Sequence, residues 1–473
     1  MSTPGLFLAG EQAGPKRAIR EIRKEIADVY LSDSRAWVIG FSGGKDSTCL
    51  LQLVWYSIAE LEPAQRHKPV YVVASDTLVE TPVIVDRLNA ALGSISAEAK
   101  VQRLPFIAEK VTPAIEDSFW VNLIGRGYPA PTTRFRWCTE RLKIRPINRY
   151  ILDHVAQHGE VVVVLGARKS ESATRAQVIA LHGRSGQLLS RHSNLPNAFV
   201  YLPIRDLSTD DVWSYLLQVG NPWGDDNHDL LALYRSTQDG ECPVVIDSTT
   251  QTCGNSRFGC WVCTVVTREQ ALTSLIEHGV DWLEPLLEMR ERLVATQDPA
   301  AKRTYRDFRR RNGRVSFTKD GKIIPGPYYL EFCQDLLRQL LRAQVEIRRT
   351  GPDPTFALIS EAELAEIRRL WRFERQDWVD SLPAIYREET GADPNWAVED
   401  VGVFGPRELN LLREHCERNG VPTQLACKLL DLEAEMQSMV RRSRIFHRID
   451  QILSEEWRSE AEVVESMPPA LED

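Results

Sequence analysis

The sequence predicts a doubly wound α/β domain with a mostly parallel sheet, followed by a mainly helical region. Up to about residue 265, short runs rich in valine and isoleucine alternate with segments of helical apolar spacing, as in βαβ units. Beyond that point the β-rich runs fade, and amphipathic patterns with turn-rich breaks continue to about residue 460. We therefore predict a first domain over residues 1–265, a helical domain over 266–460 and an acidic tail over 461–473.

The elements of the first domain are predicted from apolar periodicity and from capping signals. Capping-box spacing marks helix starts at Ser208 with Asp211 and, in the helical region, at Ser360 with Glu363. Proline at the first helical position marks another start at Thr81-Pro82. In chain order we expect a helix over 16–31, a strand over 37–39, a helix after residue 46, strands within 68–77 and 99–106, a helix over 144–158, and strands within 160–168 and 199–204.

Composition restricts the classes of protein to consider. The chain of 473 residues is 43% hydrophobic and 26% charged, which is ordinary for a globular protein. Its net charge of −8 means that binding to nucleic acid requires a local basic patch or a partner. No apolar stretch approaches the length that spans a bilayer, and no secretion signal is visible, so we expect a cytoplasmic protein without membrane attachment.

A glycine turn joins the first strand to the next helix in "WVIGFSGGKDST", residues 37–48. Such a turn gathers backbone N–H groups at the positive end of a helix dipole, which suits phosphate. Gly43 and Gly44 permit positive φ and close approach of an anion. The pattern is not Walker A, because Asp46 follows Gly44-Lys45 where Walker A has Ser or Thr. An ordinary turn with a solvated Lys45 is the alternative.

We predict that this loop binds the phosphates of a nucleotide. Lys45 would balance the phosphate charge and Asp46 would hold Mg²⁺. The predicted nucleotide contacts are Phe41, Ser42, Gly43, Gly44, Lys45, Asp46, Ser47, Thr48, Asp76, Arg168 and Arg175.

Asp76 and Arg168 belong to this set because each follows a predicted strand, and the carboxyl ends of parallel strands meet at one edge of the sheet. Arg175 lies in the same charged loop as Arg168, "LGARKSESATRA". The alternatives are a helix N-terminal acid for Asp76 and solvated surface for the loop charges.

Two basic segments contain interleaved aromatic residues. "RFRWCTERLKIRP", residues 134–146, has five basic side chains against one acid, and "AKRTYRDFRRRNGR", residues 301–314, is the strongest positive run of the helical region. Both suit a polyanion such as a nucleic-acid backbone, and a solvated basic surface or helix face is the alternative for each. We assign Lys143, in the first segment, to the catalytic residues together with Lys45, Asp46 and Arg168.

A cysteine cluster is the second strong signal. "CGNSRFGCWVC" places Cys253, Cys260 and Cys263 in a compact loop, and Cys138 in the first basic segment is the best fourth ligand. Four thiolates satisfy either zinc or an iron–sulfur cluster, so spacing does not choose the metal. Cys242 is a reserve ligand, and buried unliganded cysteines are the alternative.

These stretches together resemble the phosphoadenylylsulfate reductase superfamily of PP-loop ATP pyrophosphatases. More narrowly, they resemble the DndC family, the sulfur-transfer component of bacterial DNA phosphorothioation systems. The resemblance rests on "GFSGGKDST", "SDTLVETP", "FRWCTERLKIRP", "LGARKSESATRA", "NPWGDDN" and "CGNSRFGCWVC", and extends to about residue 345.

The resemblance implies an adenine-nucleotide α-hydrolase-like fold, ATP pyrophosphatase activity and a 4Fe-4S cluster on Cys138, Cys253, Cys260 and Cys263. It implies that ATP adenylates a nonbridging oxygen of a DNA backbone phosphate, which sulfur then replaces. The implied partners are DNA, subunits of the DndD and DndE type, and a cysteine desulfurase as sulfur donor.

Four alternatives are weighed against this interpretation. A protein of the SspD type, from single-strand phosphorothioation, would share the chemistry. A nucleotide-sensing scaffold with a structural cluster would release no pyrophosphate. A phosphoadenylylsulfate reductase would need a redox cysteine near its C-terminus, and no cysteine follows Cys427. A tRNA thiolase of this superfamily usually has two Cys-x-x-Cys motifs, whereas only Cys260 and Cys263 form one here.

Overall fold

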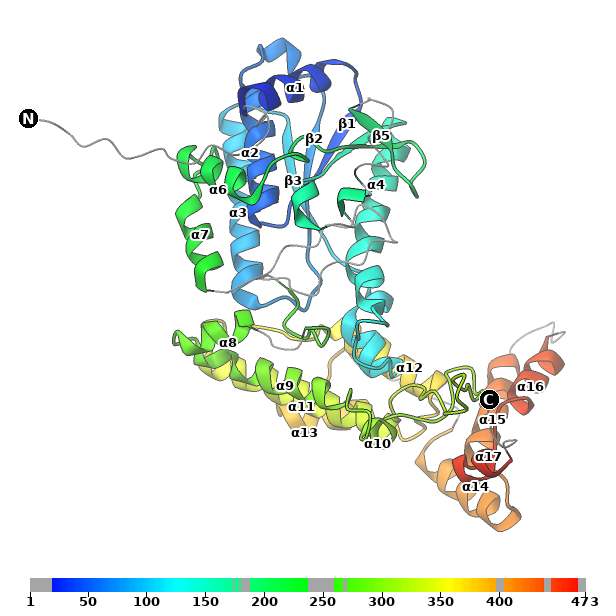
Figure 1. Cartoon of the computed structure of the whole chain (residues 1–473). Coiled ribbons are helices and arrows are strands. Elements are labelled where there is room, and N and C mark those ends of the chain that lie inside the picture. The colour runs from blue at the N-terminus through cyan, green and yellow to red at the C-terminus, as the bar shows by residue number, and fades with distance from the viewer. Residues whose placement is uncertain are drawn as a thin grey trace, which may run out of the picture. The chain divides into compact units, whose positions relative to one another are not determined.

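The computed structural model of the chain describes residues 19–466 except 173–174, 178, 180–187, 237–258, 267–269, 397–403 and 438–443. The chain divides into two compact units, which Figure 1 colours by residue number. The first unit comprises 1–76, 82–111 and 144–259, and the second comprises 77–81, 112–143 and 260–473.

The first unit contains a six-stranded sheet of order β3-β2-β1-β4-β6-β5. β1 is central and pairs in parallel with β2 on one side and β4 on the other, while β5 lies antiparallel to β6 at one edge. This arrangement confirms the predicted mostly parallel, doubly wound sheet. The strands are β1 (Ala36–Gly40), β2 (Val70–Ser75), β3 (Phe106–Val111), β4 (Val161–Val164), β5 (Leu189–Arg191) and β6 (Ala198–Tyr201).

Helices cover both faces of the sheet because β1 is buried on both. Trp37 and Ile39 pack into a core with α1, α2, α3, α6 and α7, whereas Ala36 and Val38 pack into a second core with α4. Figure 1 shows α2 and α3 on one side of the sheet and α4 on the other. The helices of this unit are α1 (Ile19–Leu31), α2 (Lys45–Ala59), η1 (Pro63–Gln65), α3 (Pro82–Val101), α4 (Arg145–His158), η5 (Lys169–Glu171), α6 (Thr209–Gln218) and α7 (Asn227–Ser236).

The direction of winding reverses beside β1. The chain places β2 and then β3 on one side of β1, and then returns to place β4 on the other side. Such a reversal opens a crevice at the carboxyl ends of the two strands that flank it. The loops that follow β1 and β4 therefore lie side by side, and these loops carry the predicted phosphate-binding residues.

The second unit is mainly helical, as predicted for the later part of the chain. The segment 112–143 and its end form the short helix η2 and two short π-helices, η3 and η4, and the other helices follow residue 260. The helices are η2 (Ile115–Asp117), η3 (Val121–Gly125), η4 (Thr139–Ile144), α8 (Gln270–Glu277), η6 (Asp281–Leu283), α9 (Glu284–Ala295), α10 (Lys302–Tyr305), α11 (Leu330–Thr350), α12 (Glu361–Glu374), α13 (Ser381–Thr390), α14 (Pro406–Asn419), α15 (Thr423–Gln437), α16 (Ile445–Leu453) and α17 (Glu460–Glu465).

The segment 112–143 forms part of the core of this helical unit. The Trp120 indole donates to the carbonyl of Leu358 at 2.8 Å, and the Trp371 indole donates to the carbonyl of Ile124 at 2.9 Å. α12 also packs so closely on η3 that a Cβ at Gly125 would lie 2.8 Å from a Leu370 methyl group. A single domain boundary at residue 265 does not describe this arrangement, because the segment 112–143 folds with helices that follow residue 260.

One predicted strand and one basic segment of the helical region differ from expectation. The third strand was expected within 99–106, but α3 continues to Val101 and β3 runs from Phe106 to Val111. β3 is an edge strand whose exposed polar residues hide its β pattern. The basic segment 301–314 is helical only over Lys302–Tyr305 and then continues as irregular chain with isolated bridges, such as the bridge between Arg309 and Val315.

The predicted tail begins as a short helix. α17 starts with a capping box between Ser459 and Glu462, and Val463 is buried. Residues 467–473 lie outside the described part. Within the described ranges, no helix has both the length and the apolar character that crossing a membrane requires.

We predict that Ile39→Ala lowers the free energy of unfolding by about 2–5 kcal/mol, because it empties a fully buried site on the central strand. Ile107→Ala on edge strand β3, where the side chain is exposed, is the matched control and should cost less than about 1 kcal/mol. Urea denaturation followed by circular dichroism measures both, and equal losses would contradict the central position of β1.

Candidate functional site

The turn after β1 has the geometry of an anion-binding loop. Gly43 has φ of +70°, in the left-handed region that favours glycine. Gly44 is extended and forms the N-cap of α2, and no side chain caps this helix. The N-terminus of α2 therefore presents backbone N–H groups and the positive end of its dipole to the space above the strands.

Hydroxyl groups hold this turn in shape. The Ser47 hydroxyl donates to the carbonyl of Gly44 at 3.0 Å and accepts from the backbone N–H of Ser42 at 3.3 Å. The two serine hydroxyls also lie 3.1 Å apart. These contacts close the loop on itself, so its conformation does not depend on a ligand.

Three charged side chains join the loop to the end of β4. The Arg168 Nε donates to Asp46 Oδ1 at 2.7 Å, and Lys45 Nζ lies 3.1 Å from Asp46 Oδ2. Arg168 is fully buried, and its guanidinium also donates to the Ser170 hydroxyl at 2.7 Å. Two cations therefore share one carboxylate at the crevice beside β1. Because both Asp46 oxygens are engaged by cations, a Mg²⁺ ion at Asp46 would have to compete with Lys45 and Arg168.

The backbones of the two loops touch at Gly166. A Cβ added at this residue would lie 3.0 Å from the carbonyl oxygen of Asp46 and 3.2 Å from its carbon. Only glycine lets the chain after β4 approach the first turn of α2 this closely. The same approach brings Arg168 to Asp46.

The other predicted nucleotide contacts have ion-pair partners of their own. Asp76, at the end of β2, is buried and pairs with Lys110 at 3.1 Å. Arg175 is buried and pairs with Glu171, four residues earlier. Their predicted roles toward a nucleotide stay predictions.

A small cavity adjoins the loop within the first unit. It has a volume of about 40 Å³, and Phe41, Ser42, Gly43 and Thr48 form one wall. Leu88 of α3 and Trp223 form the apolar part of the opposite wall. This volume is far below the roughly 300–1,000 Å³ of ligand pockets, so a nucleotide would need these walls to separate.

The predicted cysteine loop is described from Gly259 onward, and its part from Cys260 belongs to the second unit. Cys260 forms an isolated bridge with Glu80, and its sulfur lies 3.3 Å from the Thr77 hydroxyl. The backbone N–H of Cys263 donates to the carbonyl of Cys260 at 2.9 Å, which closes a tight turn. Cys253 and Cys242 lie outside the described residues.

Cys138 is an electrostatic neighbour of this loop. Burial raises the pKa of its thiol to about 11, and the charge of Cys263 adds to this, whereas Lys143 lowers it. Burial likewise raises the pKa of Cys260 to about 12, and Lys143 opposes the shift. The charge of Lys143 thus acts on both Cys138 and Cys260, and that of Cys263 acts on Cys138.

These cysteines do not form a closed metal site. In the part of the chain that the structure describes, no three His, Cys, Asp or Glu side chains converge closely enough to hold a metal ion. Three sulfur donors and a compensating Lys143 suit a thiolate-ligated group, and such a group needs a fourth ligand from elsewhere.

Arg290 of α9 anchors the backbone of the cysteine loop through two hydrogen bonds. Its Nε donates to the carbonyl of Cys263 at 3.0 Å and its Nη2 to the carbonyl of Val266 at 2.7 Å. The side chain is almost fully buried. Arg290 satisfies backbone acceptors that the tight turn leaves without intra-loop partners.

Part of the chain matches a known protein family. Residues 36–265, just under half of the chain, match the family described as phosphoadenosine phosphosulfate reductase domain. Over these residues the chain is similar to that family. The match includes the phosphate loop, the Arg168 loop and the cysteine loop.

Two individual proteins are similar to parts of the chain. An uncharacterised protein of Methanocaldococcus jannaschii is 26% identical over 198 residues, which are 42% of this chain and 35% of that protein. The chain thus spans about a third of the length of that relative. The solved U34-tRNA thiolase NcsA from Methanococcus maripaludis with its [4Fe-4S] cluster is 12% identical, with a TM-score of 0.28, over 60% of this chain and 82% of that chain. A score this low supports no argument about function.

The matched segment contains site residues that sequence reasoning missed. Tyr234 of α7 accepts from the backbone N–H of Lys45 at 3.2 Å, and Lys45 Nζ lies 5.4 Å from the centre of its ring. Trp223 lies in "NPWGDDN", a stretch noted for its resemblance but given no role. In the second unit, Thr77 and Arg290 were missed because no pattern in their own segments marks them as site residues. Cys49, beside the loop, is fully buried, and burial raises the pKa of its thiol, as expected for a core residue.

We predict that Gly166→Ala lowers the free energy of unfolding by about 1–3 kcal/mol, because the new methyl group pushes the first turn of α2 away from β4. Gly93→Ala in α3 is the matched control, since nothing lies within 4 Å of its added Cβ. It should stabilise the helix by about 0.5–1 kcal/mol. Thermal denaturation compares the two variants, and effects of equal sign would contradict the close approach.

Proposed function

We propose that the chain is an ATP pyrophosphatase that activates a backbone phosphate of DNA for replacement of one nonbridging oxygen by sulfur. The observation that carries the proposal is the cationic loop at the reversal beside β1, where Lys45 and Arg168 flank Asp46 at the N-terminus of α2. The match of residues 36–265 to the phosphoadenosine phosphosulfate reductase domain family supports it.

The loop supplies what cleavage of ATP between its α- and β-phosphates requires. The departing pyrophosphate gains negative charge, which backbone N–H groups at a helix N-terminus and fixed cations stabilise. Lys45 and Arg168 already lie in place through Asp46, so they need little reorganisation when a phosphate displaces the carboxylate as their partner. Asp46, once released, can then serve Mg²⁺ as predicted.

The proposed reaction has two steps. In the first, a nonbridging oxygen of the DNA phosphate attacks the α-phosphate of ATP, and pyrophosphate leaves. In the second, the terminal sulfur of a persulfide supplied by a cysteine desulfurase attacks the activated phosphorus, and the oxygen leaves with AMP. A thiol reductant then cleaves the S–S bond, which leaves the sulfur on phosphorus and forms a disulfide. DndD- and DndE-type subunits would bring the DNA and select the site.

The cysteines support the sulfur half of the proposal. Cys138, Cys260 and Cys263 would hold a 4Fe-4S cluster together with Cys253, and Lys143 would offset the negative charge of the thiolates. Such a cluster supplies sulfur or electron chemistry when it is bound. Arg290 keeps the loop in the shape that presents Cys263.

We predict that Lys45→Ala lowers the rate of AMP formation from ATP at least about 100-fold, because a fixed cation at the pyrophosphate is lost. Lys169→Ala is the matched control, since this exposed lysine of the same unit pairs only with Asp206 among its described contacts. Its rate should stay within about twofold of wild type. Chromatography of the nucleotides measures both rates, and unchanged turnover in Lys45→Ala would remove the loop from the mechanism.

We also predict that anaerobically purified protein is brown and contains iron, and that Cys260→Ser loses both the colour and the iron. Cys416→Ser is the control, because this buried cysteine of α14 lies outside the predicted ligand set. Absorption spectra and metal analysis give the result. Stoichiometric zinc without iron would contradict the cluster.

A further inference from the structure

The two basic segments noted in the sequence meet at Tyr128 in the second unit. Arg141, from the first segment, lies over the Tyr128 ring at 5.5 Å, and Arg311, from the second, lies over it at 5.1 Å. Both guanidinium groups also donate to the Tyr128 hydroxyl, at 3.3 Å and 2.9 Å. One aromatic side chain therefore holds two arginines that are far apart in sequence. Each of them also pairs with one acid, Arg141 with Asp117 and Arg311 with Glu374.

A third arginine joins this pair. Burial lowers the pKa of Arg126, and the positive charges of Arg311 and Arg141 lower it further, against Glu374. Arg126 donates to the carbonyl of Glu116 and to Asn122 Oδ1, and it forms no ion pair with a carboxylate within the described ranges. Placing these positive charges near one another costs free energy, and a bound anion would offset that cost.

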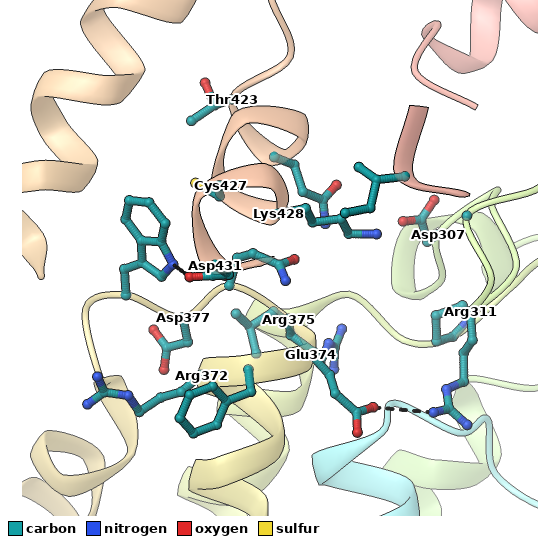
Figure 2. Close-up of a pocket in the computed structure, with 18 of the residues that line it drawn as sticks. Asp307, Arg311, Arg372, Glu374, Arg375, Asp377, Thr423, Cys427, Lys428 and Asp431 are labelled. Atoms are coloured by element: carbon teal, nitrogen blue, oxygen red, sulfur yellow. Dashed lines mark hydrogen bonds and ion pairs between the residues drawn. The ribbon is translucent and has the colours of Figure 1, made fainter. Parts of the chain in front are cut away.

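Arg126 and Arg311 also line a large cavity of about 1,350 Å³ within the same unit. Figure 2 shows this cavity, with Arg311, Arg372 and Arg375 on one side and Lys428 on another. Ten basic side chains and seven carboxylates line it, although acids outnumber bases over the whole chain. The basic residues are Arg126, Arg309, Arg310, Arg311, Arg369, Arg372, Arg375, Arg413, Lys428 and Arg448.

Most of the carboxylates in this cavity already have partners. Glu374 pairs with Arg311 at 3.4 Å, an ion pair drawn in Figure 2, and Asp431 accepts from the Trp378 indole at 2.9 Å. Four pairs join acids and bases of the lining to each other: Asp307 with Arg309, Glu374 with Arg311, Glu435 with Arg448, and Glu455 with Lys428.

Two of the remaining arginines pair with acids outside the lining, Arg369 with Glu366 and Arg372 with Asp380. The excess of positive charge therefore comes from Arg126, Arg310, Arg375 and Arg413. Arg310 donates to the carbonyl of Pro325 at 3.2 Å, and neither Arg310 nor Arg413 forms an ion pair with a carboxylate in the described part of the chain. Arg310 and Arg311 are exposed. The cavity thus offers several guanidinium groups along an open wall, and guanidinium is the group best suited to phosphate oxygens.

An exposed aromatic ring adjoins the arginines. Phe135 is 46% exposed, and its ring centre lies 6.3 Å from that of Tyr128. Arginines in a row beside an exposed ring are typical of surfaces that follow a sugar–phosphate backbone and stack on a base. An acidic polypeptide would use the cations but would leave this ring without a partner.

We propose that the arginine surface formed by Arg126, Arg141, Arg310 and Arg311 around Tyr128 binds the phosphate backbone of a nucleic-acid strand, with Phe135 against a base. This inference rests on the proposed function in taking that strand to be the DNA substrate. The surface includes the segment that carries Cys138, so binding there would bring the strand to the cysteines of the same unit.

The test measures binding of a short fluorescein-labelled DNA strand to the full chain by anisotropy, without ATP, from about 50 to 200 mM salt. The double variant Arg310→Gln/Arg311→Gln should bind at least about tenfold more weakly than wild type. It should also reduce the slope of log K against log salt concentration by about one for each arginine removed.

The matched control is Arg349→Gln/Arg418→Gln, which removes two exposed arginines that pair with acids on their own helices. It should keep both the affinity and the slope of wild type. Equal behaviour of the two double variants, or equal competition by polyglutamate and by unlabelled DNA, would overturn the arginine surface as a nucleic-acid site.

The outcome separates this inference from the proposed function. Failure of wild type to form AMP and pyrophosphate contradicts the proposed function and leaves the binding comparison intact. Wild-type formation of AMP and pyrophosphate together with undiminished DNA binding by Arg310→Gln/Arg311→Gln contradicts the inference alone.

Discussion

The buried ion pair between Arg168 and Asp46 is the interaction on which the candidate site depends. It joins the loop after β1 to the loop after β4, the two strands between which the winding of the sheet reverses. Removing one partner of a buried pair typically costs about 3–5 kcal/mol, because the other charge is left without compensation. Arg168 is fully buried, so Asp46 and neighbouring acceptors must satisfy it in the folded state.

This constraint explains several neighbouring features. Gly166 lets the two loops approach, and positive φ at Gly43 turns the chain into α2. Lys45 completes a triad of charges whose middle member is an acid. In this arrangement Asp46 fixes two cations where a phosphate would bind, and the fold provides the site before any ligand arrives.

The second unit carries three of the cysteines on which the proposed sulfur chemistry rests. Its core contains the segment 112–143, which carries Cys138 at its end, and a buried Arg290 holds the turn of Cys260 and Cys263. The chain passes from the first unit to the second directly after Asp76. The proposal therefore assigns nucleotide activation to residues of the first unit and sulfur chemistry to Cys138, Cys260 and Cys263 of the second.

Local patterns predicted most of the fold. Valine-rich runs gave β2 and β4 because these strands are buried on both faces, and the capping boxes at Ser208 and Ser360 fix helix starts through contacts three residues apart. The edge strand β3 was misplaced, and the short antiparallel β5 was not expected, because neither has a continuous apolar run.

The candidate site was predictable where its residues follow strands and not where they come from distant elements. Arg168 was expected at the sheet edge that carries the phosphate loop, and the structure joins it to Asp46 of that loop. Tyr234 contacts Lys45 from α7, and Arg290 reaches the cysteine turn from α9, so neither had a signal within its own segment. The meeting of Arg141 and Arg311 at Tyr128 depends on tertiary folding alone.

The central claim is that the loop cleaves ATP between the α- and β-phosphates. Its most direct test incubates the anaerobically purified chain with ATP and Mg²⁺, with and without DNA, and identifies the products. The account predicts AMP and pyrophosphate in equal amounts, formed faster when DNA is present. Formation of ADP and phosphate, or no cleavage in either condition, would contradict it.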